Sequence, residues 1–238
     1  METYNFKAAN WVILVLTFIF SIIGGLFLII FFLPKGSNAF HFILSFVALL
    51  FFIIYILRQT SFAKVEITLD NETISIKWLE QFLFHKKQNV IISFDEIATY
   101  VNQSDLNWDW LKIEMIDGKI HKIWYSKFFS TNDDYFNFVS AFISKVKNHN
   151  NTVLKKAASE GSDVKLKSIK RAKSIYETTG GLIMAGFSIV AIIGVPILFI
   201  FIPHKNPTNY GLLGMGYIGA IYFLHQFYVQ RKKRKTDD

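Results

Sequence analysis

Long apolar segments and one stretch of alternating polar and apolar residues divide the chain. Four segments of 19 to 23 residues contain no Asp, Glu, Lys or Arg. A helix needs about 20 such residues to cross roughly 30 Å of hydrocarbon, because it rises ~1.5 Å per residue. The predicted spans are residues 11–33, 39–57, 182–202 and 210–229. A cleaved signal peptide fits the first segment less well, because its apolar run is too long and no small-residue cleavage site follows.

The basic residues flank these segments asymmetrically. The loops within the two predicted hairpins hold one lysine each, Lys35 and Lys205. The opposite side carries Lys7, Arg58 and the basic tail over residues 231–235. Because Lys and Arg accumulate on the cytoplasmic side of a membrane, we predict a multi-pass protein with both termini in the cytosol.

Between the two hairpins the apolar positions alternate with polar ones, which is typical of half-buried strands. Strands are predicted over residues 65–69, 74–78, 97–101, 108–115 and 120–125, with less regular strand character around residues 82–92. The Asp117-Gly118 pair indicates a tight hairpin turn, because such turns need a residue that tolerates positive φ.

A helix is expected after these strands, near Thr131 or Asn132, with Asp133 and Asp134 in its first turn. Its apolar residues recur at the spacing of one helical face. They are Tyr135, Phe138, Val139, Phe142, Ile143 and Val146. Strands followed by one covering helix predict a compact α+β domain over residues 59–149 that folds on its own.

The order of elements between the two hairpins resembles the bacterial pleckstrin-homology-like (PH-like) domains of small membrane proteins. The resemblance is carried by the segments Val65–Asp70, Ser93–Ile97 and Leu111–Met115, by the Asp117-Gly118 turn and by the closing helix. The resemblance implies a bent, partly open β-barrel of seven strands capped by one helix, without enzymatic chemistry. About six strands can be read from the sequence. Eukaryotic relatives bind phosphoinositides near the loop between the first two strands, which we assign here to the acidic residues 70–72.

The predicted fold is therefore an α+β membrane protein with four transmembrane helices in two hairpins and a cytosolic PH-like β-barrel capped by one helix. Its expected parts are hairpin 1 over residues 1–58, the β domain over 59–149, a basic linker over 150–179, and hairpin 2 with the basic tail over 180–238. The expected location is the bacterial inner membrane.

The linker concentrates the positive charge of a chain whose net charge is +8. Five basic residues fall between positions 165 and 173, beside Val164, Ile169 and Ile175. The candidate membrane-surface residues are Lys165, Lys167, Lys170, Arg171 and Lys173. A helix beginning near Ser162 would lay them on anionic lipids, with ~1 kcal/mol from each basic residue near the surface. The alternative is that this charge serves only to fix the membrane topology.

Small residues recur four apart in the last two apolar segments. The pairs are Gly181 with Ala185 and Gly216 with Ala220. This spacing lets helix backbones approach closely, so these residues are candidates for helix packing within the chain or against a partner.

The sequence contains no recognisable catalytic or cofactor motif. Cys is absent and the six His residues lack zinc-type spacing. No nucleophile elbow, phosphate loop or dinucleotide fingerprint is present. We therefore predict no catalytic residues, no metal, no cofactor and no enzymatic activity. The basic stretch lacks interleaved aromatic residues, so nucleic acid is not an expected partner.

The sequence thus favours a non-enzymatic membrane protein whose PH-like domain is an interaction or scaffold module, as an accessory subunit of a membrane assembly. The expected partners are the bilayer, its anionic lipids, and another protein or further copies of this chain. Two alternatives remain open. One is a nucleotide-sensing effector that disrupts the membrane, for example in anti-phage defence, which a polar pocket inside the barrel would favour. The other is a transporter component, although the spans carry no charged residue.

Overall fold

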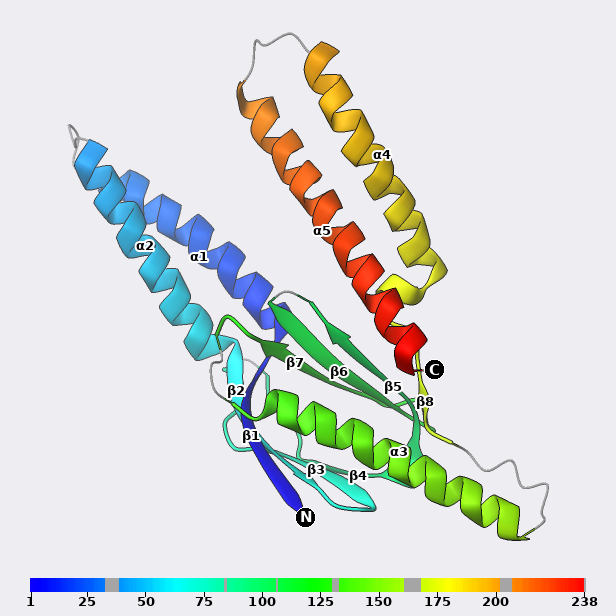
Figure 1. Cartoon of the computed structure of the whole chain (residues 1–238). Helices are drawn as coiled ribbons and strands as arrows, with labels where there is room; N and C mark the ends of the chain where they lie inside the picture. The colour runs from blue at the N-terminus through cyan, green and yellow to red at the C-terminus, as the bar shows by residue number, and fades with distance from the viewer. Residues whose placement is uncertain are drawn as a thin grey trace. The chain divides into compact units, whose positions relative to one another are not determined.

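The computed structural model of the chain describes residues 1–32, 39–83, 85–105, 107–129, 133–160, 168–201 and 207–237. The chain divides into two compact units, Met1–Lys170 and Arg171–Asp238. The first unit contains a sheet, a helical hairpin and one further long helix, and the second contains the last two helices (Figure 1).

One sheet is the centre of the first unit. Its strands are β1 (Glu2–Ala9), β2 (Phe62–Leu69), β3 (Thr73–Trp78), β4 (Val90–Ser93), β5 (Ile97–Ser104), β6 (Trp108–Met115), β7 (Ile120–Ser126) and β8 (Lys170–Arg171). They lie in the order β4-β3-β2-β1-β7-β6-β5-β8. The period-two pattern correctly predicted β2, β3, β5, β6 and β7. The predicted turn at Gly118 is confirmed by its φ of 84°.

Strand β1 is not among the strands predicted from the sequence, although it lies in the middle of the sheet. It pairs with β2 along its whole length, from Glu2 opposite Leu69 to Ala9 opposite Phe62. On its other side Ala9 pairs with Trp124 of β7. Two expectations change as a result. The acidic turn at residues 70–72 joins β2 to β3, not the first two strands, and the segment 59–149 lacks a central strand.

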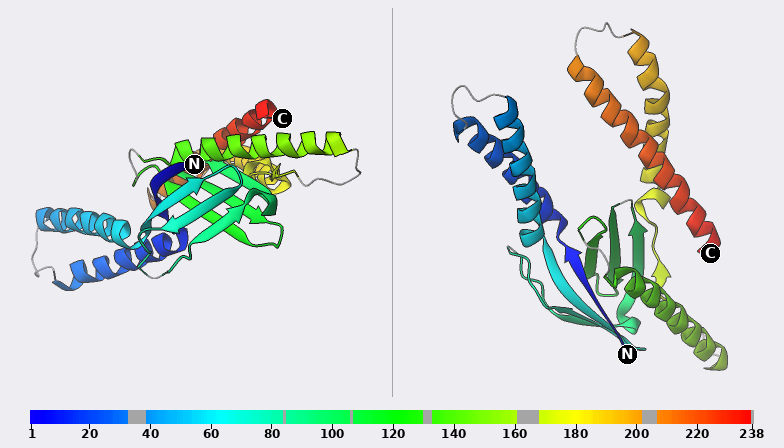
Figure 2. Two further views of the ribbon diagram at one scale, coloured as in Figure 1. Left: turned by 90° about the horizontal axis from the view of Figure 1, so that it is seen from below. Right: turned by 60° about the vertical axis from the view of Figure 1, so that its left-hand side comes forward.

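The apolar core lies on the inner side of this sheet. The sheet is strongly bent, so that β1–β4 and β5–β7 form two facing halves (Figure 2). Side chains from both halves belong to one buried cluster, for example Ile67 and Ile74 with Leu111 and Ile113. The core is therefore a packed apolar interior.

Helix α3 (Tyr135–Glu160) contributes the apolar stripe predicted from its spacing. Tyr135, Phe138 and Phe142 are at most 1% exposed, whereas Ile143 is 37% exposed. The helix begins against β1. The Asp134 carboxylate accepts a bond from the Asn5 backbone N–H at 3.2 Å, and Asp133 accepts one from Lys7 at 3.4 Å. The predicted capping residues 131 and 132 lie outside the described residues.

Two helices, α1 (Trp11–Phe32) and α2 (Ala39–Thr60), form a hairpin inserted between β1 and β2. They approach closely at Gly25, where an added Cβ would lie 2.1 Å from Leu49 Cδ1. The absence of a side chain at Gly25 leaves the room that the Leu49 side chain fills. Segments Trp11–Ile29 and Ile43–Thr60 are long and apolar enough to cross a membrane.

The prediction of four transmembrane helices is wrong. Among the described residues, only the two segments of the hairpin have the length and hydropathy of a span. Helix α4 (Thr179–Phe201) contributes a shorter apolar segment, Thr179–Gly194. Helix α5 (Pro207–Asp237) mixes glycine, tyrosine, His225 and Gln226 with its apolar residues and ends in the basic tail. An uncharged run was therefore not sufficient evidence for a span: the apolar segment reported in α4 is shorter than a span, and polar residues such as His225 and Gln226 lower the hydropathy of α5.

Candidate functional site

The junction between the sheet and the hairpin is short on both sides. One residue, Asn10, separates β1 from α1, and Ser61 alone separates α2 from β2. The Asn10 backbone N–H donates to the Ser61 carbonyl at 2.8 Å, which continues the pairing of β1 with β2. The Asn10 side chain accepts a bond from the Ile13 N–H at 3.3 Å, which caps α1. No flexible linker therefore separates the hairpin from the sheet.

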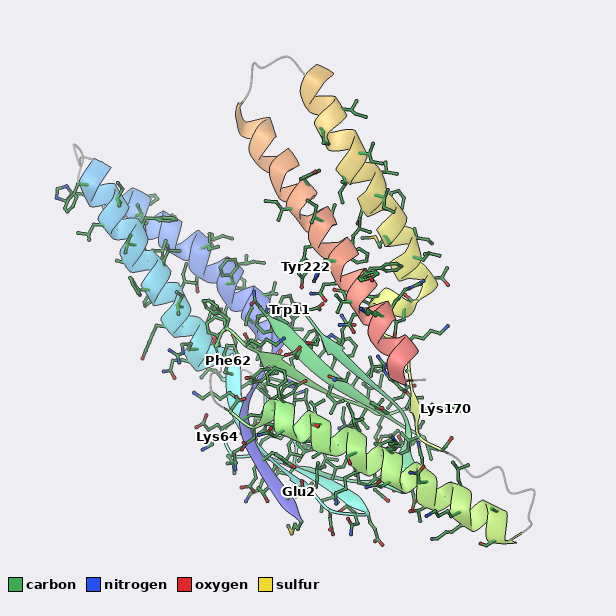
Figure 3. All side chains as sticks on the ribbon, viewed as in Figure 1. Glu2, Trp11, Phe62, Lys64, Lys170 and Tyr222 are labelled. Atoms are coloured by element: carbon green, nitrogen blue, oxygen red, sulfur yellow. The ribbon has the colours of Figure 1, made fainter. Side chains whose placement is uncertain are left out.

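An aromatic surface begins at this junction. Figure 3 shows Trp11 at the base of α1, beside the sheet. Its ring centroid lies 5.2 Å from that of Trp108 and 5.9 Å from that of Trp124. Trp110 continues the cluster at 5.9 Å from Trp124. These four tryptophans, together with Lys122, are called the tryptophan surface below.

The sheet register explains why these side chains meet. Residues 108, 110 and 112 alternate with buried ones along β6, so they share the outer face of the sheet. Trp110 lies directly opposite Trp124 of β7. The pairing of Ala9 with Trp124 then brings the first residues of α1 to the same place. Sequence reasoning missed this site because it assigned no strand to residues 2–9.

Lys122 is held between two indole rings. Its Nζ lies 4.1 Å from the centroid of Trp110 and 4.0 Å from that of Trp124. Such cation–π contacts contribute ~0.5–2 kcal/mol each, depending on exposure. Partial burial, and secondarily the positive charge of Lys112, lower the pKa of Lys122. Lys112 itself is paired with Glu114 at 2.9 Å, whereas no described ion pair includes Lys122.

A cavity of about 610 Å³ lies beside the tryptophan surface. It is lined by the start of α1, by the connection between β3 and β4, and by Lys122 and Trp124 of β7. Its polar lining includes His85, Lys87 and Lys122, and no Asp or Glu is among the described lining residues. Its volume is within the ~300–1,000 Å³ typical of ligand pockets. The lining favours an anion with an apolar part over a cation.

Asp109 is a buried acidic residue on the inner side of β6. Its side chain is 1% exposed and lies 3.2 Å from Nζ of Lys127, which is one-third exposed. Burial raises the pKa of Asp109, and the hydrogen bond with Ser104 and the charge of Lys127 oppose this shift only in part. Burial, and secondarily the charge of Asp109, raise the pKa of Tyr135 at the start of α3. This arrangement makes the stability of the unit depend on pH.

The contribution of Asp109 to stability is expected to fall as the pH rises above roughly 4, the pKa of an unperturbed Asp. Because burial raises the pKa of Asp109, the folded state binds more protons than the unfolded chain between the two pKa values. Asp109→Asn should remove part of this decline, as measured by the free energy of unfolding in urea at a series of pH values. Asp117→Asn is the control, because the exposed Asp117 has a pKa that Lys119 lowers. Identical pH profiles for the wild type and Asp109→Asn would contradict the assignment.

The proposed membrane-surface residues do not lie on one helix face where the structure describes them. Lys165 and Lys167 lie outside the described residues. Lys170 and Arg171 form the short strand β8, followed by Lys173 and the 3₁₀-helix η2 (Ile175–Glu177). The helix predicted through this segment is therefore wrong over residues 168–178. Arg171 lies 3.5 Å from the buried Glu177 carboxylate, which gives it a structural partner.

The reason lies in the surroundings of Ile169, which was expected on the apolar face of that helix. Ile169 is 4% exposed and belongs to the core of the first unit. Asn150 of α3 bonds both its N–H and its carbonyl at 2.9 Å. Helix α3 continues to Glu160, into the segment 150–179 that was predicted to be a basic linker. Tertiary contacts thus hold residue 169 extended.

The four helix-packing candidates have different surroundings. In the second unit, Ala185 and Ala220 are buried at 4% and 8% exposure. An added Cβ at Gly181 would lie 2.4 Å from the Ile175 carbonyl oxygen, so Gly181 permits η2 to approach α4. No atom lies within 4 Å of the position that a Cβ would take at Gly216. Three of the four are therefore at packed positions.

Within the described ranges, no group of three or more His, Asp or Glu side chains is placed to hold a metal ion. The tryptophan surface and its adjoining cavity are consequently the candidate functional site, and their chemistry is that of binding. Comparison with family models, with curated proteins and with solved structures finds no match for this chain.

Proposed function

We propose that this chain is a non-enzymatic interaction module anchored in a bacterial inner membrane. In this proposal α1 and α2 cross the bilayer as a hairpin, and the sheet lies directly beneath it in the cytosol. The observation that carries the proposal is the insertion of the hairpin between β1 and β2, two strands that pair along their whole length. A binding surface on such a sheet stays at a fixed distance from the membrane. The expected partner is another protein or a second copy of this chain, with anionic lipids at the membrane surface.

The charges beside the hairpin support a cytosolic sheet. Lys7, Arg58 and Lys64 lie on the side of the sheet, and Lys35 is the single basic residue between the two helices. This excess agrees with the accumulation of basic residues on the cytoplasmic side. The N-terminus lies on the same side, because it begins the sheet.

The PH-like resemblance is part of the proposal, and two features support it. Strands β1 to β7 followed by α3 match the seven strands and closing helix that the resemblance implies. Strand β1 supplies the strand that could not be read from the sequence. The connection between the first two strands is then the helical hairpin itself. The family's recognition surface would accordingly face the bilayer.

The interior of the sheet favours an interaction module over the nucleotide-sensing effector. A ligand-sensing barrel needs a polar internal cavity, whereas here the inner faces of both sheet halves pack in one apolar cluster with Phe138 and Phe142 of α3. The buried carboxylate of Asp109, paired with the half-buried Lys127, lies outside this cluster. The surface that remains for binding is on the outside of the sheet.

Reporter fusions test the proposed topology. A reporter that is active only outside the cytosol should be active when inserted after Gly36 and silent after Gly161. A reporter that is active only in the cytosol should give the opposite pattern. The reason is that residue 36 lies in sequence between the two proposed spans, whereas residue 161 comes directly after α3, whose first half covers the core of the sheet. Cytosolic activity at both positions would show that the hairpin does not cross the membrane.

A further inference from the structure

We propose that the tryptophan surface rests in the headgroup layer of the bilayer that the hairpin enters, with Lys122 contacting lipid phosphate. This proposal rests on the membrane-anchored module described above. It adds a specific orientation of the sheet: the outer faces of β6 and β7 lie against the membrane, so the sheet is not suspended below it.

The depth of the surface follows from Trp11. This residue is the first of α1 and begins the apolar segment Trp11–Ile29, so it lies where that span leaves the hydrocarbon. The interfacial layer on each side of the hydrocarbon is roughly 5–8 Å thick. The rings of Trp108 and Trp124 are within 6 Å of Trp11 and therefore lie at a similar level.

The chemistry of the surface suits this layer. An indole ring combines a large apolar face with one N–H donor, and tryptophan is enriched at membrane–water interfaces for that reason. Trp11 is 41% exposed, so it is not a core residue. The rings form a continuous series from the hairpin across β7 to β6, and the other three tryptophans are half-buried, so each retains some accessible surface.

Charge supports lipid as the occupant. The cation of Lys122 rests on the two indole faces, and no described carboxylate pairs with it. Across the adjoining cavity lie Lys87 and His85, again without an acidic neighbour in the described lining. An ammonium group in this position is suited to a phosphate oxygen at the membrane surface, where basic residues are attracted to anionic lipid.

The test uses the full chain, which contains no native cysteine, so single cysteines can be labelled cleanly. Lys112→Cys places a fluorophore on the outer face of β6, two residues beyond Trp110. Lys145→Cys places it on α3, and Val47→Cys places it in the middle of α2. Each labelled chain is reconstituted into vesicles of phosphatidylcholine and phosphatidylglycerol that contain lipids with a nitroxide quencher on the headgroup or on the acyl chain.

Headgroup nitroxide should quench the label at residue 112 several-fold more strongly than the label at residue 145. Lys122→Gln should reduce the quenching at residue 112, and this reduction should be larger when phosphatidylglycerol is present than in phosphatidylcholine alone. The control Lys77→Gln removes an exposed lysine from β3, away from the tryptophan surface, and should change nothing.

The label at residue 47 separates the two proposals. If acyl-chain nitroxide quenches residue 47 but neither quencher reaches residue 112, the hairpin is inserted and the docking proposal is overturned. If acyl-chain nitroxide does not quench residue 47, the hairpin is not inserted and the proposed membrane-anchored module is contradicted. A label at residue 112 that is shielded from both lipid and aqueous quenchers would also overturn the proposal, because a protein would then occupy the tryptophan surface.

Discussion

The first unit alone, residues 1–170 with Asn-Gly in place of residues 11–60, is expected to fold into a soluble, cooperatively melting sheet. Asn10 and Ser61 already form a hydrogen-bonded pair at the end of the β1–β2 ribbon. Two residues of the type Asn-Gly can close such a pair as a tight turn, whose twist matches that of the strands. The replacement removes the hairpin and leaves the register of the sheet unchanged.

The decisive comparison is with residues 61–160 alone. This fragment contains β2 to β7 and α3 but lacks β1 and β8. This fragment should lack a cooperative melt, because β2 and β7 lose the strand between them and Phe6 leaves the core. Thermal unfolding followed by circular dichroism distinguishes the two chains. Equal melting of both would show that β1 is dispensable and would restore the expectation that the β domain folds without it.

Phe142→Asp is expected to abolish folding of the sheet and of α3, which covers its core. Phe142 is fully buried and packs against Phe94, Tyr100 and Phe138, with ring centroids 5.4 to 6.3 Å apart. Removing the ring costs ~3–5 kcal/mol, and a buried carboxylate without a partner adds several kcal/mol more. The sum is comparable to the roughly 5–15 kcal/mol by which a whole domain is stable.

The neighbouring substitution Ile143→Asp provides a control on the same helix. Ile143 is 37% exposed, so a carboxylate there remains hydrated and should change the midpoint of urea unfolding only slightly. Both variants are compared in the chain that carries Asn-Gly in place of the hairpin, by circular dichroism and urea titration. A folded Phe142→Asp chain would mean that α3 does not cover the core as described.

Local patterns predicted the elements whose determinants are local. The alternation along β6 and β7 and the turn at Gly118 depend on neighbouring residues, and the stripe of α3 depends on residues three and four apart. Strand β1 has an equally regular pattern, with Phe6 and Ala8 buried. It was missed because its partner β2 begins more than fifty residues later, after α1 and α2, whose long apolar runs dominate the hydropathy pattern of this part of the sequence.

The tryptophan surface could be predicted in part. The turn at Gly118 sets the register of β6 against β7 and thereby places Trp110 opposite Trp124. The contact with Trp11 depends on the pairing of Ala9 with Trp124, which is a long-range closure that the sequence pattern does not indicate. The prediction of a helix in the basic linker was wrong for a similar reason. The hydrogen bonds from Asn150 and the burial of Ile169 override an apparent helical spacing.

The central position of β1 also sets the order in which the molecule can assemble during synthesis. β1 leaves the ribosome first, but its partner β2 follows only after the two apolar helices have been made. Until then β1 exposes both edges, which is a recognised risk for aggregation. In the proposed topology, insertion of α1 and α2 as a hairpin would bring the start of α1 and the end of α2 together and so return β2 to β1. Insertion would thus act as the nucleation step for the sheet, and a delay in targeting should appear as misfolding of the cytosolic part.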